Sequence, residues 1–203
     1  VHTAAQSLRN NDCNMAIVGA ANIILEPELS IVFSSLNALS SDSRCKPFSN
    51  DANGFVRSEG CAVIILKRLS DAQKNKDNIL AVIKGSAVNQ DGRSNGFTAP
   101  NVSAQTLLLK TALSNARIQP SEVSYIEAHG TGTKIGDPIE MEAILTVFSE
   151  HKSTENKLKI GSVKSNIGHT ESVAGLASII KTILSLNNNL LPKSLHFNSP
   201  NEL

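Results

Sequence analysis

The feature that most constrains the fold is a pattern that occurs twice in the second half of the chain. In each copy, a short apolar run leads into a glycine-containing turn that carries a histidine, and a helix-like stretch follows. The first copy places a strand at 123–130 and a helix at 137–151. The second places a strand at 157–166 and a helix at about 171–186. Strands that alternate with helices favour parallel pairing. The pattern therefore predicts a layered α/β fold with a largely parallel sheet.

Three further apolar runs, at 15–23, 61–69 and 79–90, predict strands earlier in the chain. The first two are almost continuously apolar, which is typical of strands covered on both faces. Apolar residues at helical spacing predict helices near residues 1–8 and 108–116. No sequence repeat of 20–50 residues and no linker-like boundary divides the chain, so we expect one domain or one large fragment of a domain.

The helix at 137–151 has the expected signals of a helix start. Asp137 is a residue type that caps helices, and Pro138 suits the first helical position. Glu140 stands three residues after Asp137, the spacing of a capping box. We therefore expect both carboxylates to bind the backbone at the beginning of this helix.

Charge and apolar content exclude several classes of function. The formal net charge is +1 in 203 residues, and Lys and Arg are scattered, so a basic nucleic-acid surface is not expected. No apolar run approaches the roughly 18 residues that a membrane span requires, and residues 1–12 do not resemble a signal peptide. The three cysteines, Cys13, Cys45 and Cys61, form no CxxC pair. We expect them to be small buried residues in a reducing, cytoplasmic compartment.

Two histidines occupy equivalent places, each just past a predicted strand. His129 ends "SYIEAH" and His169 ends "GSVKSNIGH". Because sites in α/β folds gather at the carboxyl ends of strands, both histidines are expected to face one cleft. A structural role for either ring remains the alternative. A metal site built from His129, Asp137 and His169 is not expected, because neither histidine has a local partner at chelating spacing.

Three polar residues beside the histidines are further candidates. Lys164 precedes His169 by five residues and is expected at the end of a strand, where it would orient a neighbouring group or favour developing negative charge. Thr131 and Thr133 alternate with glycines after His129. Their hydroxyls either bind local backbone or contact a polar substrate arm that lies across the glycines. The glycines are spaced GxGxxxG, which does not match the dinucleotide fingerprint, and no phosphate-binding Gly-Lys-Ser/Thr sequence occurs.

Four long segments together resemble one family. "EAHGTGTKIGDPIE", "GSVKSNIGHTESVAGLASIIK", "CKPFSNDANGFVRSEGCAVIILKRL" and "GSAVNQDGRSNGFTAPN" are similar to motifs of β-ketoacyl synthase domains of type I polyketide synthases. The resemblance implies a thiolase-like αβαβα sandwich that forms a homodimer. It implies acyl transfer to a cysteine, followed by decarboxylative Claisen condensation with a malonyl-type thioester, as in polyketide and fatty acid biosynthesis.

The resemblance also implies roles for individual residues and partners. His129 and His169 match the paired catalytic histidines, with Lys164 in support, and Thr131 and Thr133 match the threonines that contact the phosphopantetheine arm. The acyl and malonyl groups would arrive as thioesters on an acyl carrier protein. No metal and no directly bound cofactor are implied. Asn53 and Ser58 stand where the family more often has Asp and Gly.

The resemblance covers an internal part of the family's domain and does not include its beginning or its end. The nucleophilic cysteine of the family belongs to a turn that would precede Val1, and none of the three cysteines here lies in that context. We therefore expect a domain fragment truncated at both ends and inactive alone, with residues 1–70 from the N-terminal half and 79–203 from the C-terminal half. The alternative is a non-condensing relative that serves as a dimerisation partner or structural platform. A coenzyme A-dependent thiolase is disfavoured, because no second cysteine is suitably placed.

Overall fold

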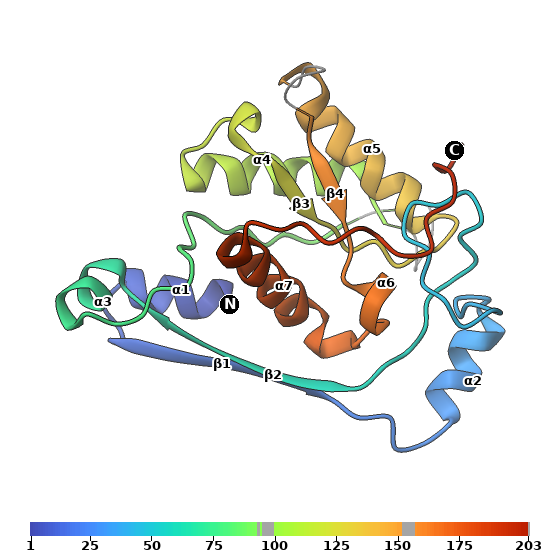
Figure 1. Ribbon diagram of the computed structural model, residues 1–203, viewed down its shortest axis with the longest axis horizontal. Coiled ribbons are helices and arrows are strands. Elements are labelled where there is room, and N and C mark those ends of the chain that lie inside the picture. Colours follow the sequence, from blue (N-terminus) through green and yellow to red (C-terminus); the bar gives the residue numbers. More distant parts are fainter. Residues whose placement is uncertain (93, 95–99, 152–156, 203) are drawn as a thin grey trace.

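Two small sheets organise the molecule. The computed structural model describes residues 1–92, 94, 100–151 and 157–202 (Figure 1). Strand β1 (Met15–Asn22) pairs with β2 (Gly60–Lys67), and β3 (Tyr125–Glu127) pairs with β4 (Lys159–Gly161). The β3–β4 pair is parallel, as the strand–helix alternation predicts.

The β1–β2 pair is antiparallel, with Met15 opposite Lys67 and Asn22 opposite Gly60, so the prediction of parallel pairing is wrong there. The long connection between these strands carries α2 (Glu28–Ser35) and stays at the end of the sheet where β1 finishes (Figure 1). A parallel neighbour would require the chain to cross back over the sheet, and this connection does not do so.

The helices form layers around the two sheets. Helix α7 (Ala174–Asn188) lies between the β1–β2 and β3–β4 sheets and contacts strands of both (Figure 1). Helices α4 (Val102–Ala116) and α5 (Gly136–Phe148) pack together on the other face of β3–β4. The order sheet, helix, sheet, helix supplies four of the five layers of the expected sandwich. Among the described residues, the remaining α-helices are α1 (His2–Arg9), α3 (Leu69–Asn75) and the four-residue α6 (Lys164–Ile167), and 3₁₀ turns lie at Pro120–Glu122, Ser149–His151 and Glu171–Val173.

A buried cluster on α5 forms the core between the helices and β3–β4. Ile144, Val147 and Phe148 are buried in it. Apolar side chains of α4 and of both strands or their flanks pack against them, namely Leu109, Leu113, Val123, Ile126, Leu158 and Ile160. This packing fixes α5 against the carboxyl end of β3, where the first histidine lies.

One face of the β1–β2 sheet is open. Exposure alternates along both strands, and Ile17 is 69% exposed and Ile65 66% exposed on the open face. The described residues therefore do not cover this sheet on both faces, contrary to the expectation from its continuous apolar sequence. The side chains on the open face are still apolar, so the face has the chemistry of a buried layer.

The segment 79–90 forms no strand, which corrects a second prediction. A strand is defined by hydrogen bonds to a neighbouring strand, and no described residue pairs with this segment along its length. Much of the loop that follows, Arg93 and 95–99, lies outside the described residues.

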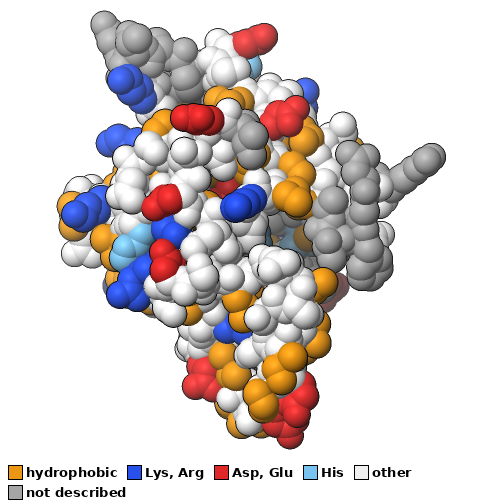
Figure 2. Space-filling view, turned by 90° about the vertical axis from the view of Figure 1, so that its right-hand side faces the viewer, with side chains coloured by type: hydrophobic (Ala, Val, Ile, Leu, Met, Phe, Trp, Pro, Cys, Tyr) orange, Lys and Arg blue, Asp and Glu red, His pale blue; other side chains and the backbone are white. Residues whose placement is uncertain are grey.

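Helix α2 carries a second exposed apolar surface. Figure 2 shows hydrophobic side chains gathered on the lower lobe, where α2 lies, with acidic side chains beside them. The exposed large apolar residues of this helix and its flanks include Leu25, Leu29, Ile31, Val32 and Leu36. Among the described helices, none combines the length and the apolar character that crossing a bilayer would demand.

Candidate active site

The structure brings His129 and His169 together. His129 lies two residues beyond the end of β3, and His169 lies two residues beyond α6. Their ring centroids are 5.4 Å apart, and the ring planes cross at 82°. An N–H donor lies about 3 Å from its acceptor atom, so two rings at this separation can both donate to one acceptor atom placed between them. The two rings are therefore neighbours, while the shared cleft expected from the sequence and the catalytic role of the rings remain predictions.

The backbone of His169 is fixed by the segment around Arg57. The His169 N–H donates to the carbonyl of Val56 at 2.7 Å, and the Ser58 N–H donates to the His169 carbonyl at 3.0 Å. The preceding Gly168 has φ +76°, and a Cβ there would lie 3.0 Å from the Val56 carbonyl oxygen. Glycine is therefore required at 168 for the histidine to enter this pairing.

The tautomer of the His169 ring is fixed by a backbone donor. The N–H of Glu171 donates to Nδ1 of His169 at 3.0 Å. A nitrogen that accepts carries no proton, so in the neutral ring the proton lies on Nε2. His169 can thus present an N–H donor to a ligand without being charged.

Both rings resist protonation. Burial lowers the pKa of His169 to about 4, and the positive charge of Lys164 acts in the same direction, while Glu171 opposes it. Restricted access of water lowers the pKa of His129 to about 4 as well, with further lowering by Lys164 and His169. By its accessible surface His129 is exposed and His169 is half-buried, so water can stabilise a charged His129 more easily than a charged His169. Two neutral rings at pH 7 follow from this environment.

Lys164 and Glu140 hold the backbone of His129. Lys164 is 2% exposed, and its Nζ donates to the His129 carbonyl at 2.5 Å. The Glu140 carboxylate accepts from the N–H of His129 at 2.7 Å and from that of Gly130 at 2.8 Å. Burial lowers the pKa of Lys164, and the charges of Glu140 and Glu127 oppose this effect. Lys164 is the first residue of α6, not the end of a strand as predicted, because β4 stops at Gly161.

Asp137 and Glu140 do not form the predicted capping box. Helix α5 begins at Gly136 without a side-chain cap. The Asp137 carboxylate, 1% exposed, instead accepts from the N–H of Phe48 at 2.7 Å and from that of Gly132 at 3.1 Å. Both acids reach from the helix to the loops around the histidines, because the unpaired backbone donors of those loops are closer partners than those of the helix.

The two threonines lie on the same loop, close together. Thr131 is buried, and its hydroxyl lies 3.1 Å from the hydroxyl of Thr133. Thr133 also accepts from the N–H of Gly136 at 3.3 Å. The contact of Thr133 with Gly136 matches the local-backbone interpretation, whereas the partner of the Thr131 hydroxyl is a side chain. The contact of both threonines with a substrate arm remains a prediction.

A row of aromatic rings supports the far side of His169. Phe55 lies edge-on to His169 with centroids 5.1 Å apart, and Phe33 of α2 lies 5.6 Å from Phe55. Arg57 stacks over Phe33 and pairs at 2.7 Å with Glu171, the residue whose N–H fixes the His169 ring. The row connects α2 to the histidine pair.

Sequence reasoning missed several residues that shape this site. The carboxylates of Glu127, Asp137 and Glu140 bind loop backbone, and Phe55 packs on a histidine ring. The available signal was the density of acidic residues, "EAHGTGTKIGDPIE", in a loop that faces a buried lysine. Buried carboxylates require donors, and glycine-rich loops expose backbone N–H groups.

Of the three cysteines, Cys45 lies beside the site, because its Sγ accepts from the N–H of Val56 at 3.2 Å. Cys45 is buried, and burial raises the pKa of its thiol, whereas Cys61 is exposed and Cys13 is half-buried. The prediction of three buried cysteines is therefore right only for Cys45. Among the described residues, no group of three or more His, Cys, Asp or Glu is placed to hold a metal ion.

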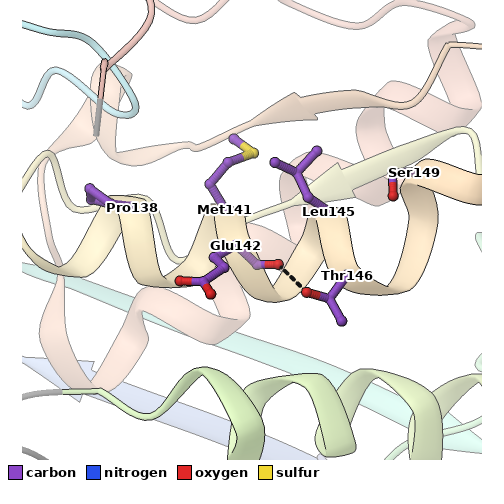
Figure 3. Close-up of a pocket in the computed structure, with 6 residues that line it drawn as sticks. All are labelled: Pro138, Met141, Glu142, Leu145, Thr146 and Ser149. Atoms are coloured by element: carbon purple, nitrogen blue, oxygen red, sulfur yellow. Dashed lines mark hydrogen bonds between the residues drawn. The ribbon is translucent and has the colours of Figure 1, made fainter.

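A shallow groove runs along the outer side of α5, on a different surface. Figure 3 shows its lining by six residues of one helical stretch, in which the Thr146 hydroxyl donates to the Glu142 carbonyl at 2.8 Å. The lining residues are Pro138, Met141, Glu142, Leu145, Thr146 and Ser149. Neither histidine lines this groove, so it is not part of the candidate site.

Comparison with known proteins identifies related chains. Residues 1–72 match the family model of the β-ketoacyl synthase N-terminal domain, and residues 80–198 match that of its C-terminal domain. The chain is 51% identical over 201 residues to a component of the phenolphthiocerol/phthiocerol polyketide synthase of Mycobacterium tuberculosis, covering 99% of this chain and 11% of that protein. It is 45% identical to the pikromycin polyketide synthase component PikAIII of Streptomyces venezuelae, covering 100% of this chain and 13% of that protein.

Solved structures show the same fold. The ketosynthase from module 6 of the bacillaene synthase from Bacillus subtilis 168 is 46% identical, with a TM-score of 0.95 over 99% of this chain and 36% of that one. The oxazolomycin ketosynthase domain OzmH KS7 of Streptomyces albus is 39% identical, with a TM-score of 0.94 over 99% of this chain and 35% of that one. The thiolase-like α/β fold expected from the sequence is thereby confirmed. The chain spans only a small part of the length of these relatives.

Proposed function

The chain belongs to the β-ketoacyl synthase family, and we propose that it is part of a ketosynthase domain that extends acyl chains by decarboxylative condensation. The observation that supports the proposal most is the pair of neutral imidazoles, His129 and His169, with ring centroids 5.4 Å apart. Because the chain spans a small part of its relatives, the activity is assigned to the complete domain that carries these residues.

The histidines would act on the malonyl-type thioester. When the bond between its methylene carbon and its carboxylate breaks, CO₂ leaves and the electron pair passes into an enolate whose oxygen becomes negative. Two N–H donors aimed at that oxygen stabilise the charge, each by about 3–4 kcal/mol. The fixed tautomer of His169 supplies one donor on Nε2. The resulting carbanion then attacks the acyl thioester, forming a carbon–carbon bond and releasing the cysteine thiolate.

Lys164 would act through His129. Its Nζ and the Glu140 carboxylate hold the backbone of His129 on two sides, so the imidazole does not need to be ordered when substrate binds. The ammonium group also adds positive charge near the developing enolate. Lys164 is therefore a positioning residue with an electrostatic effect on both rings.

The substrates would reach the site on a carrier protein. We infer that Thr131 and Thr133 contact the phosphopantetheine arm, since their hydroxyls lie on a glycine-containing loop directly after His129. The acyl acceptor would be a cysteine outside this chain, because Cys45 is buried with a raised pKa and the other two cysteines lie in no comparable setting. The proposal includes a homodimeric complete domain in the cytoplasm, with residues 1–70 and 79–203 from its two halves.

The test is product formation by the complete domain. Purified domain, acyl thioester and malonyl-loaded acyl carrier protein should give a ketoacyl product longer by two carbons, detected as its carrier-bound mass. Replacement of His129 by Ala should lower the rate of product formation by about 10²–10³-fold, while Lys110→Met on the exposed side of α4 should not lower it. Acyl loading or product formation that never occurs in the wild-type domain would contradict the proposal. That outcome would favour a non-condensing structural partner, as would a residue other than Cys at the nucleophile position.

A further inference from the structure

A buried ion pair beneath the histidines is not used by the reaction described above. Lys181 of α7 and Glu127 of β3 lie 2.7 Å apart, with side chains 11% and 6% exposed. Charged groups are rarely buried to this extent unless they are paired and hydrogen-bonded, because removing them from water costs several kcal/mol per ion. The pair therefore needs an explanation in its contacts.

The Glu127 carboxylate joins three parts of the structure. One oxygen accepts from the Val163 N–H at 2.5 Å, and the other accepts from the Tyr125 hydroxyl and from Lys181. Val163 is the residue directly before Lys164, and Glu127 is two residues before His129. A single side chain thus connects β3, the turn into α6, and α7, and it does so at the origin of both histidine segments.

The surroundings leave the carboxylate little freedom. A Cβ added to Gly161, which pairs with Glu127 across β3–β4, would lie 2.6 Å from the Tyr125 hydroxyl and 3.4 Å from Lys181 Nζ. The cluster therefore occupies the space that a side chain at position 161 would need. Burial and the nearby Glu127 raise the pKa of Tyr125, so its hydroxyl remains a donor. Glu127 also acts on Lys164, where its charge opposes the effect of burial.

We propose that Glu127, neutralised by Lys181, is a positioning residue that fixes the turn bearing Lys164 and His169 relative to His129. The inference rests on the proposed function. It predicts an effect on decarboxylation, which needs both imidazoles aligned on one oxygen, and little effect on acyl loading, which needs the nucleophile. A misplacement of about 1 Å can cost about 10²-fold in rate.

The experiment compares three variants of the complete domain. Glu127→Gln keeps an acceptor for the Val163 N–H but leaves Lys181 as an unpaired buried charge. Lys181→Met leaves the Glu127 carboxylate unpaired, and the double variant removes both charges. Lys110→Met, an exposed change of the same type on α4, is the control. Two rates are measured for each: acyl transfer to the nucleophile, by the mass of the intact protein, and CO₂ release from a malonyl thioester.

The expected result is a loss of decarboxylation of about 10–100-fold in Glu127→Gln, with acyl loading nearly unchanged and with partial recovery in the double variant. If Glu127→Gln fails to fold, the double variant against wild type gives the same comparison of rates. The inference is overturned if both rates fall together with the melting temperature, if decarboxylation is unchanged, or if the double variant is worse than either single one. A wild-type domain that does not decarboxylate contradicts the proposed function instead.

Discussion

Glu140 and Lys164 hold the peptide groups of His129 from two sides. The carboxylate of Glu140 accepts from the His129 N–H at 2.7 Å, and the ammonium group of Lys164 donates to the His129 carbonyl at 2.5 Å. The negative carboxylate thus binds the backbone donor of His129, and the positive ammonium group binds its backbone acceptor. This arrangement fixes the backbone from which the imidazole of His129 projects. It also keeps the buried ammonium group of Lys164 near the carboxylates of Glu140 and Glu127.

Replacement of Lys164 by Met should destabilise the complete domain. The His129 carbonyl would lose its donor, and the carboxylates of Glu140 and Glu127 would lose a nearby positive charge. The loss of a hydrogen bond from a buried charged group costs about 1.5–3 kcal/mol. Urea unfolding should show this loss of free energy for Lys164→Met, whereas Lys110→Met should remain within about 0.5 kcal/mol of wild type. Equal stability of the two variants would disprove the described role of Lys164.

Two glycine substitutions should have opposite effects on stability. Gly168→Ala forces a Cβ to a positive φ and to 3.0 Å from the Val56 carbonyl, at a cost of about 1–3 kcal/mol. Gly175 lies in α7 with nothing within 4 Å of an added Cβ, so Gly175→Ala should stabilise by about 0.5–1 kcal/mol. Thermal unfolding of both variants checks the signs. A Gly168→Ala variant as stable as wild type would show that His169 does not depend on this turn.

The histidine rings should titrate below their ordinary pKa. NMR titration should place the pKa of His169 near 4, and that of His129 below 6.5. The unfolded rings titrate near 6.5, so the unfolded state binds more protons between that pH and about 4. Stability should therefore be complete above about pH 6.5 and should fall as the pH drops through this window. A His169 ring that titrates at 6.5 would mean that water reaches it freely.

The open face of β1–β2 should make the 203-residue chain prone to aggregation. Ile17 and Ile65 stand opposite each other on this face, 69% and 66% exposed. The double change Ile17→Thr and Ile65→Thr should raise the concentration at which the chain remains monomeric in light scattering. The matched change on the inner face, Val18→Thr and Ile64→Thr, should lower stability without that benefit. Equal aggregation of both variants would indicate that this face is not responsible.

Local patterns in the sequence predicted the elements that depend on local chemistry. The apolar runs at β1 and β2 and the helical spacing at α4, α5 and α7 match the structure, although α4 begins six residues before the predicted stretch. The segment 79–90 was also predicted as a strand from its apolar residues but forms none, because strand formation depends on a partner elsewhere in the chain. Parallel pairing failed at β1–β2 for the same reason, since the path of a long connection is not encoded in the strands.

In the candidate site, too, features that depend on the local sequence were predicted, and features that depend on distant parts of the chain were not. The positions of His129 and His169 after their apolar runs could be predicted from the sequence, because each lies beside a glycine that marks the turn. The partners of Asp137 were not, because the Phe48 N–H that it binds lies 89 residues away in sequence. Capping rules consider only the nearest backbone donors, and the loops supplied better ones.

The rate of malonyl decarboxylation in single-histidine variants of the complete domain tests the central claim most directly. The account predicts that His129→Ala and His169→Ala each lower the rate of CO₂ release by about 10²–10³-fold, because each removes one donor to the same enolate oxygen. A variant of either histidine that releases CO₂ at the wild-type rate would contradict the shared role of the two rings.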